Sequence, residues 1–170
     1  MVMPQKTAIV GISGSGKSTF ARELAAQTGL PLHQMDALFW RKNWEPVPEA
    51  DYVAAQAQIL LSDQWIIEGY IDSALSDRAK AADLVIYLDL PGPLCAWRVL
   101  LRWIKHRGVA RPELPVEARE SLSLQFLWII LTRAERRAIE DALQGIPDAK
   151  IRRFRSDPTP PPPPISRPSH

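Results

Sequence analysis

The sequence predicts an α/β fold, in which a parallel sheet is covered by helices on both faces. The first observation is a series of short, continuous apolar runs, which are typical of parallel strands buried on two sides. The second is that segments with helical spacing separate these runs, as right-handed crossovers require. The third is the length of 170 residues, which fits a single domain.

Five apolar segments are predicted to be strands. They comprise residues 6–11, 30–35, 65–67, 84–88 and 151–154. The first ends at a glycine, the second is followed by Asp36, and the third by Glu68 and Gly69. The fourth is stopped by the Pro-Gly-Pro sequence at 91–93.

Helices are predicted between the strands by their apolar spacing. They cover residues 18–28, 50–64 and 94–107, and then 116–143 as one long helix or two broken ones. In the second helix, the predicted core positions are Val53, Ala57, Leu60 and Leu61. Four tryptophans are also predicted to pack in the core: Trp65, Trp97, Trp103 and Trp128. A glycine and two prolines predict a loop at residues 108–115.

The last residues differ in kind from the rest of the chain. We predict a domain over residues 1–155 and a disordered tail over 156–170, since residues 158–170 contain seven prolines. Two interpretations of this tail are open: it has no function, or it is a proline-rich docking segment. Cys95 is the single cysteine, which excludes an internal disulfide, and no signal peptide or membrane-length apolar run is recognisable. These features predict a cytoplasmic protein with no membrane partner.

Charge is divided unevenly along the chain, although its net value is only +2. Residues 1–97 hold 7 basic and 11 acidic side chains, whereas residues 98–155 hold 13 basic and 7 acidic ones. A basic second half attracts anions such as a nucleotide or a nucleic acid. An arginine-rich, solvated helix surface explains the same composition.

Residues 11–18 match the phosphate-binding pattern G-x-x-x-x-G-K-[ST], between a predicted strand and a predicted helix. In such a P-loop, glycines permit a tight turn whose N–H groups face the phosphates of ATP, at the positive end of the helix. Lys17 is predicted to reach the β- and γ-phosphates and Ser18 to bind Mg²⁺. The predicted nucleotide-binding residues are Gly11, Ser13, Gly14, Ser15, Gly16, Lys17, Ser18 and Thr19.

Acidic residues follow three of the predicted strands, where ligands of open α/β sheets bind. Asp36 is a candidate to accept a proton from a substrate hydroxyl or to help hold Mg²⁺, and a turn or cap aspartate explains it equally well. Glu68, with Gly69, is the candidate for the metal, directly or through water. Asp89 is a rival for that role, although a loop acid before Pro91 is the favoured reading.

Arginines are concentrated around the third predicted helix and the loop after it. Arg98, Arg102, Arg107 and Arg111 are candidates to close over the nucleotide and stabilise the transferring phosphoryl group. A solvated surface is the alternative. Arg133, Arg136 and Arg137 are predicted to be surface residues rather than site residues.

Loop aromatics follow Asp36. Phe39, Trp40 and Trp44 stand in a predicted loop, where they either wall a planar substrate or close an edge of the core.

In these features the chain resembles the bacterial topology modulation proteins, a branch of the adenylate-kinase-like P-loop kinases. The resemblance runs from about residue 9 to about residue 154. It includes the P-loop, the stretch 36–40 with Trp44, the stretch 65–69, and Arg78 before the stretch 82–91. Arg98, Arg102 and the pair Arg111-Pro112 complete it.

This resemblance implies a five-stranded parallel sheet, an ATP site at the P-loop and a helical or loop lid at about 98–122. It also implies catalytic roles for Lys17, Asp36 and the lid arginines, and acceptor contacts from Asp36, Trp40, Glu68, Gly69 and Arg78. One departure affects the acceptor site. The family follows its Glu-Gly with Asn-Tyr, whereas Gly69 is followed here by Tyr-Ile-Asp at 70–72.

The leading hypothesis is a kinase that transfers the γ-phosphoryl group of MgATP to a small acceptor, with nucleotides among the candidates. The alternative is a nucleotide-binding regulator that acts on DNA or a protein partner without fast turnover. The basic second half alone supports it, because no helix-turn-helix or zinc finger is recognisable. Neither the acceptor nor the oligomeric state follows from the sequence.

Overall fold

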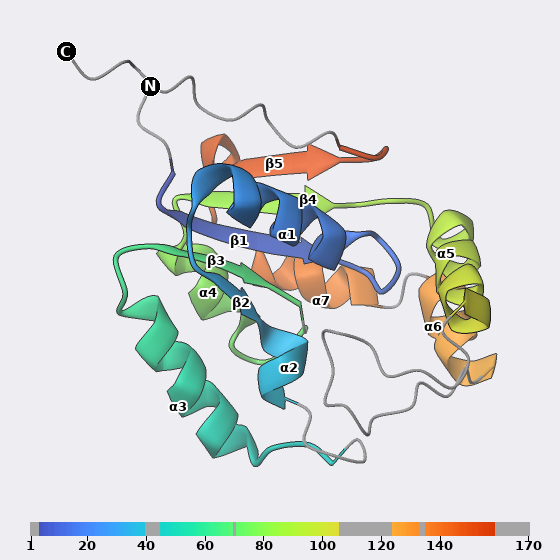
Figure 1. Cartoon of the computed structure of the whole chain (residues 1–170), viewed down its shortest axis with the longest axis horizontal. Helices are drawn as coiled ribbons and strands as arrows, with labels where there is room; N and C mark the ends of the chain where they lie inside the picture. The colour runs from blue at the N-terminus through green and yellow to red at the C-terminus, as the bar shows by residue number, and fades with distance from the viewer. Residues whose placement is uncertain (1–3, 40–44, 70, 106–123, 133–134, 159–170) are drawn as a thin grey trace.

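Five parallel strands form one sheet in the order β2-β3-β1-β4-β5 (Figure 1). The computed structural model describes residues 4–39, 45–69, 71–105, 124–132 and 135–158. The strands are β1 (Lys6–Gly11), β2 (Leu32–Gln34), β3 (Trp65–Glu68), β4 (Leu84–Leu88) and β5 (Ile151–Phe154). The predicted parallel sheet is therefore confirmed, and β2 is shorter than the predicted run.

Helices lie on both faces of the sheet (Figure 1). They are α1 (Lys17–Thr28), α2 (Met35–Phe39), α3 (Glu49–Leu60), α4 (Leu75–Ala81), α5 (Gly92–Lys105), α6 (Leu124–Thr132) and α7 (Glu135–Ala142). A short 3₁₀ turn, η2 (Asp148–Lys150), precedes β5. Helix α5 begins two residues before its predicted start, because proline is well accommodated in the first turn of a helix. The segment predicted as one helix or two contains α6 and α7, separated by two residues outside the described part.

The strand β1 shows how the sheet divides the core. Its Ala8 and Val10 face the side covered by α4 and α7. Its Ile9 faces α1, where it meets Phe20 and Leu24. Side chains alternate across a strand, so a strand that is apolar throughout is buried on both faces. The sheet thus lies between two helical layers.

The buried face of α3 differs from the predicted one. Tyr52 and Gln56 are buried, whereas Val53 and Ala57 are exposed. Leu61, also predicted to be in the core, is 76% exposed and lies just past the helix end. Relative to the prediction, α3 is rotated about its axis by about one residue. The ring of Tyr52 and the hydrogen-bonded amide of Gln56 occupy its inner face, in place of the aliphatic side chains that were predicted there.

Two of the four tryptophans predicted to be in the core are exposed. Trp65 in β3 is fully buried and Trp103 is partly buried, but Trp97 in α5 is 56% exposed and Trp128 in α6 is 67% exposed. Their side chains point away from the sheet, and the inner face of α5 is formed by smaller residues such as Cys95 and Val99.

The predicted boundary between domain and tail falls just after β5. Residues 156–158 have no regular structure, and the rest of the predicted tail lies outside the described residues, as do the loop at 108–115 and most of the predicted lid. Among the helices that the structure describes, none is both long and apolar enough to cross a membrane.

We predict that Tyr52→Ala lowers the free energy of unfolding by about 3–5 kcal/mol, because a buried ring is lost. The ring of Tyr52 packs edge-on against Phe39 with a centroid distance of 5.4 Å. Val53→Ala, one residue along the same helix, is the control and should change this free energy by less than about 0.5 kcal/mol. Chemical denaturation measures both. Similar losses for the two variants would contradict the observed orientation of α3.

Candidate active site

The P-loop connects the carboxyl end of β1 with the first turn of α1. All the predicted nucleotide-binding residues lie in this loop and the first turn of α1. Ser15 is buried and Thr19 is exposed on α1. Gly14 has a φ of 82°, and a Cβ at this position would lie 2.4 Å from the backbone oxygen of Cys95 in α5. Glycine is therefore required both by the backbone conformation and by the contact with α5.

Lys17 lies across the loop that precedes it. Its ammonium donates hydrogen bonds to the backbone oxygens of Gly11 at 2.7 Å and Ile12 at 3.0 Å. This position fixes a positive charge over the loop, next to the first-turn N–H groups of α1. The combination suits an anion, as the motif predicts.

A contact that the sequence did not indicate involves the first residue of α7. The carboxylate of Glu135 accepts a hydrogen bond from the backbone N–H of Ser13 at 3.2 Å. These residues are far apart in the sequence, and a single acid at a helix start carries no pattern that would reveal the contact. Glu135 thus joins α7 to the P-loop.

Glu68 ends β3 with a buried carboxyl group. Its Oε1 accepts a hydrogen bond from Nε2 of Gln34 at 2.9 Å, and its buried Oε2 has no hydrogen-bond partner among the described residues. Burial raises the pKa of this carboxyl group, while the positive charge of Lys17 and the neighbouring Gln34 and Ser18 side chains oppose the rise. Glu68 therefore faces the same space as Lys17 and Ser18.

These oxygen atoms suit a magnesium ion. Mg²⁺ prefers hard oxygen ligands, commonly one carboxylate, a hydroxyl and phosphate oxygens. The unpartnered Oε2 of Glu68 and the Ser18 hydroxyl form such a donor set beside the anion site. The predicted pairing of Ser18 with Glu68 is consistent with this arrangement.

Asp36 lies in the first turn of α2, immediately after β2. A Cβ on Gly69 would lie 3.4 Å from Oδ1 of Asp36, so the carboxylate adjoins the backbone at the end of β3. The charge of Asp36 also contributes to the raised pKa of Glu68. The two predicted acids are thus neighbours at the carboxyl edge of the sheet.

Asp89, the rival metal ligand, is occupied by arginines. Its Oδ2 lies 3.1 Å from Nη2 of Arg136 and 3.7 Å from Nη1 of Arg153. Glu140 binds the same two arginines, and its pKa is lowered by the hydrogen bond from Arg153. Arg136 is 36% exposed, in agreement with the predicted surface position, but its guanidinium also neutralises a buried aspartate, which the sequence did not indicate. Glu68 is the better metal candidate.

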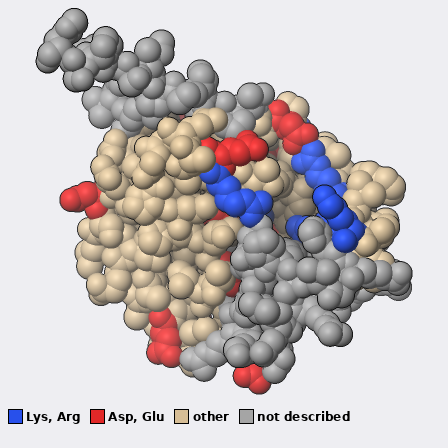
Figure 2. All heavy atoms as spheres, in the orientation of Figure 1, with Lys and Arg blue, Asp and Glu red and all other residues tan. Residues whose placement is uncertain are grey.

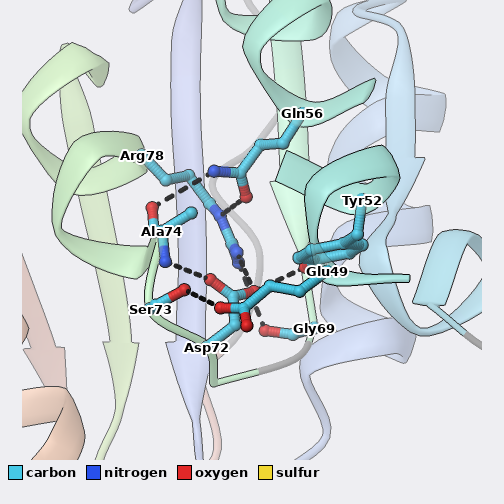
Figure 3. A network of polar contacts seen from close by, with 8 residues as sticks. All are labelled: Glu49, Tyr52, Gln56, Gly69, Asp72, Ser73, Ala74 and Arg78. Carbon is cyan, nitrogen blue, oxygen red and sulfur yellow. Dashed lines mark hydrogen bonds and ion pairs between the residues drawn. The ribbon is translucent and has the colours of Figure 1, made fainter. Parts of the chain in front are cut away.

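Arg78 is the centre of a buried network under α3 (Figure 3). Its guanidinium donates to Oδ2 of Asp72 at 2.7 Å and to Oε1 of Gln56 at 2.9 Å, and its Nη1 lies 3.4 Å from the backbone oxygen of Gly69. The Tyr52 hydroxyl donates to the same Asp72 oxygen, and burial together with this bond raises the pKa of the phenol.

The network affects the predicted substrate contact of Arg78. Its side chain is fully buried, and Asp72, its ion-pair partner, belongs to the stretch that departs from the family pattern. The guanidinium contacts the backbone oxygen of Gly69 from within the core. A direct contact between Arg78 and an acceptor stays a prediction.

Of the predicted lid arginines, Arg98 and Arg102 lie on α5, one helical turn apart. Nη1 of Arg98 is 3.9 Å from the position that a Cβ on Gly16 would take, so this guanidinium lies next to the P-loop. It also pairs with Asp157 at 2.5 Å. Arg107 and Arg111, like Trp40 and Trp44, lie outside the described residues.

On the face shown in Figure 2, one group of basic side chains lies over α1 and another lies towards α5, and acidic side chains lie beside both groups. In the basic second half of the sequence, Arg98, Arg136 and Arg153 each form an ion pair with an acid. Part of the charge division in the sequence is therefore compensated within the described residues.

Comparison with known proteins supports a P-loop kinase fold. A cytidylate kinase of Pyrobaculum aerophilum is 36% identical over 92 residues, which is 54% of this chain and 46% of that protein. The chain therefore spans about half the length of the curated relative that it matches. No protein-family model matches the chain, and the narrower resemblance to the topology modulation proteins stays a prediction.

Two solved kinases share the fold over most of both chains. A gluconokinase of Sinorhizobium meliloti 1021 has a TM-score of 0.55 and 19% identity, over 91% of this chain and 85% of its own. A shikimate kinase of Acinetobacter baumannii, in complex with shikimate, has a TM-score of 0.55 and 18% identity, over 90% and 84%. At this identity the likeness establishes the fold.

We predict that Arg78→Met lowers the free energy of unfolding by about 3–5 kcal/mol, because it leaves the buried Asp72 carboxylate without its counter-charge. The control is Lys80→Met on the same helix, since Lys80 and Asp77 are 63% and 74% exposed. Its effect should stay below about 0.5 kcal/mol. Equal effects in urea denaturation would refute the structural role of Arg78.

We predict that Glu68→Gln raises the melting temperature of the metal-free protein at neutral pH. Burial raises the pKa of Glu68 in the folded state. Its ionised form therefore destabilises the fold above that pKa, and the cost disappears below the unfolded value of about 4.3. A gain of 1 kcal/mol corresponds to a rise of about 2–4 °C for a chain of this size. Melting curves between acidic and neutral pH, with chelator present, should show the two proteins converging at low pH.

Proposed function

We propose that this protein is a kinase that transfers the γ-phosphoryl group of MgATP to a small acceptor. The observation that carries the proposal is the juxtaposition of the Lys17 ammonium with the buried, unpartnered Oε2 of Glu68 at the end of β3. A P-loop alone would support nucleotide binding. The added carboxylate supports a metal site beside the phosphates, as phosphoryl transfer requires.

Each residue would contribute positioning or charge rather than covalent chemistry. Lys17 would neutralise the β- and γ-phosphates, and Ser18 with Glu68 would hold Mg²⁺. When bound, the ion would draw charge from the oxygens of the transferring group. Asp36, beside Glu68, would orient the acceptor hydroxyl and take its proton.

The acceptor site would lie over Asp36 and Gly69, at the edge of the sheet next to Glu68. The name of the curated relative points to cytidylate, and the names of the structural neighbours point to gluconate and shikimate. All three offer a hydroxyl or phosphate oxygen as the nucleophile. We also propose membership of the topology modulation family, on the stretches 36–40 and 82–91.

The regulator hypothesis loses part of its support. It depended on a basic second half free to bind nucleic acid, yet Arg98, Arg136 and Arg153 each pair with an acid in the fold. The kinase hypothesis is tested with purified protein, MgATP and a panel of acceptors, reading ADP release. Cytidylate, gluconate, shikimate and other nucleotides form the first panel. Lack of turnover with every class of acceptor, together with DNA binding that weakens steeply with salt, would favour the regulator.

We predict that Lys17→Ala reduces phosphoryl transfer by at least about 100-fold, a typical effect of losing one charge-stabilising group. The fold should persist, because Lys17 is only partly buried and contacts backbone oxygens of its own loop. ADP release and thermal melting, measured on the same preparation, test this. Normal turnover in the folded variant would contradict the assignment.

We predict that at least one of Arg98, Arg102 and Arg111 acts mainly on the transition state. Its replacement by alanine should lower the maximal rate far more than it weakens ATP binding. Arg137, exposed on α7, is the control in place of Arg136, which pairs with Asp89. Small, equal effects at all four positions would argue against the lid.

A further inference from the structure

A stripe of large apolar side chains lies exposed on α5. Trp97, Leu101 and Ile104 are 56%, 45% and 55% exposed, and their spacing of four and three residues places them on one helix face. We call these three residues the α5 stripe. Nearby helix α6, which packs against α5, adds two more exposed side chains, Trp128 and Leu131. Grouped exposed apolar side chains of this size mark an interaction site, whereas single ones need no explanation.

The stripe is directed away from the nucleotide site. The opposite face of α5 carries Cys95 and Val99, which are buried, and their atoms contact the P-loop at Gly14. Whatever covers the α5 stripe can therefore bind without displacing the P-loop or blocking the phosphates.

The described part of the chain ends close to α5, the helix that carries this stripe. After β5 ends at Phe154, Asp157 forms its ion pair with Arg98, the residue that follows Trp97 on α5. The pair ties the chain to α5 one residue past Trp97, with the Arg98 guanidinium on the side of the helix next to the P-loop. The residues that continue from there, 159–170, lie outside the described part of the chain.

The chemistry of these residues matches an aromatic surface. Positions 160–164 are five consecutive prolines, followed by Ile165. Such a run adopts the extended polyproline II helix, whose rigid backbone loses little entropy on binding and which docks on surfaces lined by aromatic rings. Tryptophan offers the largest flat apolar face for this purpose.

The segment is also long enough. At about 3.1 Å per residue, residues 159–164 extend about 19 Å in this conformation. The seven residue steps from Trp97 to Ile104 rise about 10 Å along the helix. Because Asp157, two residues before the segment, is paired with Arg98 on α5, the segment meets the stripe at an effective concentration of the order of millimolar, which favours it over a second copy of the chain.

We propose that the proline run at 160–164 docks on the α5 stripe of its own chain, with prolines against Trp97. The docked segment covers apolar surface that would otherwise face water, and it leaves the P-loop open. This gives the C-terminal segment a structural function that is independent of the kinase activity.

The test compares the full chain with a chain truncated after Asp157, by ¹H–¹⁵N NMR of the tryptophan indole groups. Trp97→Phe and Trp128→Phe assign the two signals, and the buried Trp65 is the internal control. Truncation should shift the Trp97 signal and increase its broadening by a soluble paramagnetic agent, with Trp65 unchanged. A full chain in which residues 160–164 are replaced by serine should behave like the truncated one. An unchanged Trp97 signal in both variants would overturn the proposal.

Three further measurements separate the alternatives. The Trp97 signal of the full chain should not change on dilution, and sedimentation should give a monomer. A signal that changes on dilution, or a dimer that Trp97→Glu dissociates, would assign the stripe to a second copy and overturn docking within one chain. Nucleotide affinity should survive truncation, and a loss of tenfold, about 1.4 kcal/mol, would place the segment over the ATP site instead.

Discussion

The central position of β1 in a parallel sheet is the constraint on which the rest of the structure depends. Its register with β3 and β4 brings the carboxyl ends of these strands to one edge. The P-loop therefore emerges between Glu68 at the end of β3 and Asp89 at the end of β4. A different strand order would separate the phosphate site from its acids. The chemistry available to the site therefore depends on which side chains lie at this edge of the sheet.

The two acids on either side of the P-loop have opposite electrostatic environments. Asp89 is neutralised by arginines from α7 and β5, which makes it part of the scaffold. Glu68 is equally buried, yet one of its oxygens has no partner among the described residues. A buried carboxylate of this kind costs free energy unless a ligand compensates it. Both residues follow apolar strands in the sequence. Only their partners in the structure distinguish Asp89, which is part of the scaffold, from Glu68, the candidate metal ligand.

Elements that leave a local pattern in the sequence could be predicted. All five strands and the P-loop were found in this way, because continuous apolar runs and a glycine spacing are local properties. The inner face of α3 and the exposure of Trp97 could not be predicted. In α3, Tyr52 and Gln56 are buried by virtue of partners far along the chain, Asp72 and Arg78. In α5, the approach of Gly14 to Cys95 leaves room only for small side chains on the inner face. The contact of Glu135 with Ser13 is of the same long-range kind.

The strand order has a consequence for synthesis on the ribosome. Lys6 pairs with Trp65, and Thr7 with Leu84, so β1 is made well before either of the strands that pair with it. Its apolar side chains must remain unpaired during that time, and long-range pairing of this kind slows folding. The contacts of the P-loop region form later still, because Glu135 and Asp157 follow β4 in the sequence. The candidate nucleotide site is therefore incomplete until these residues have been made, and ligand binding can report the moment at which they join the fold.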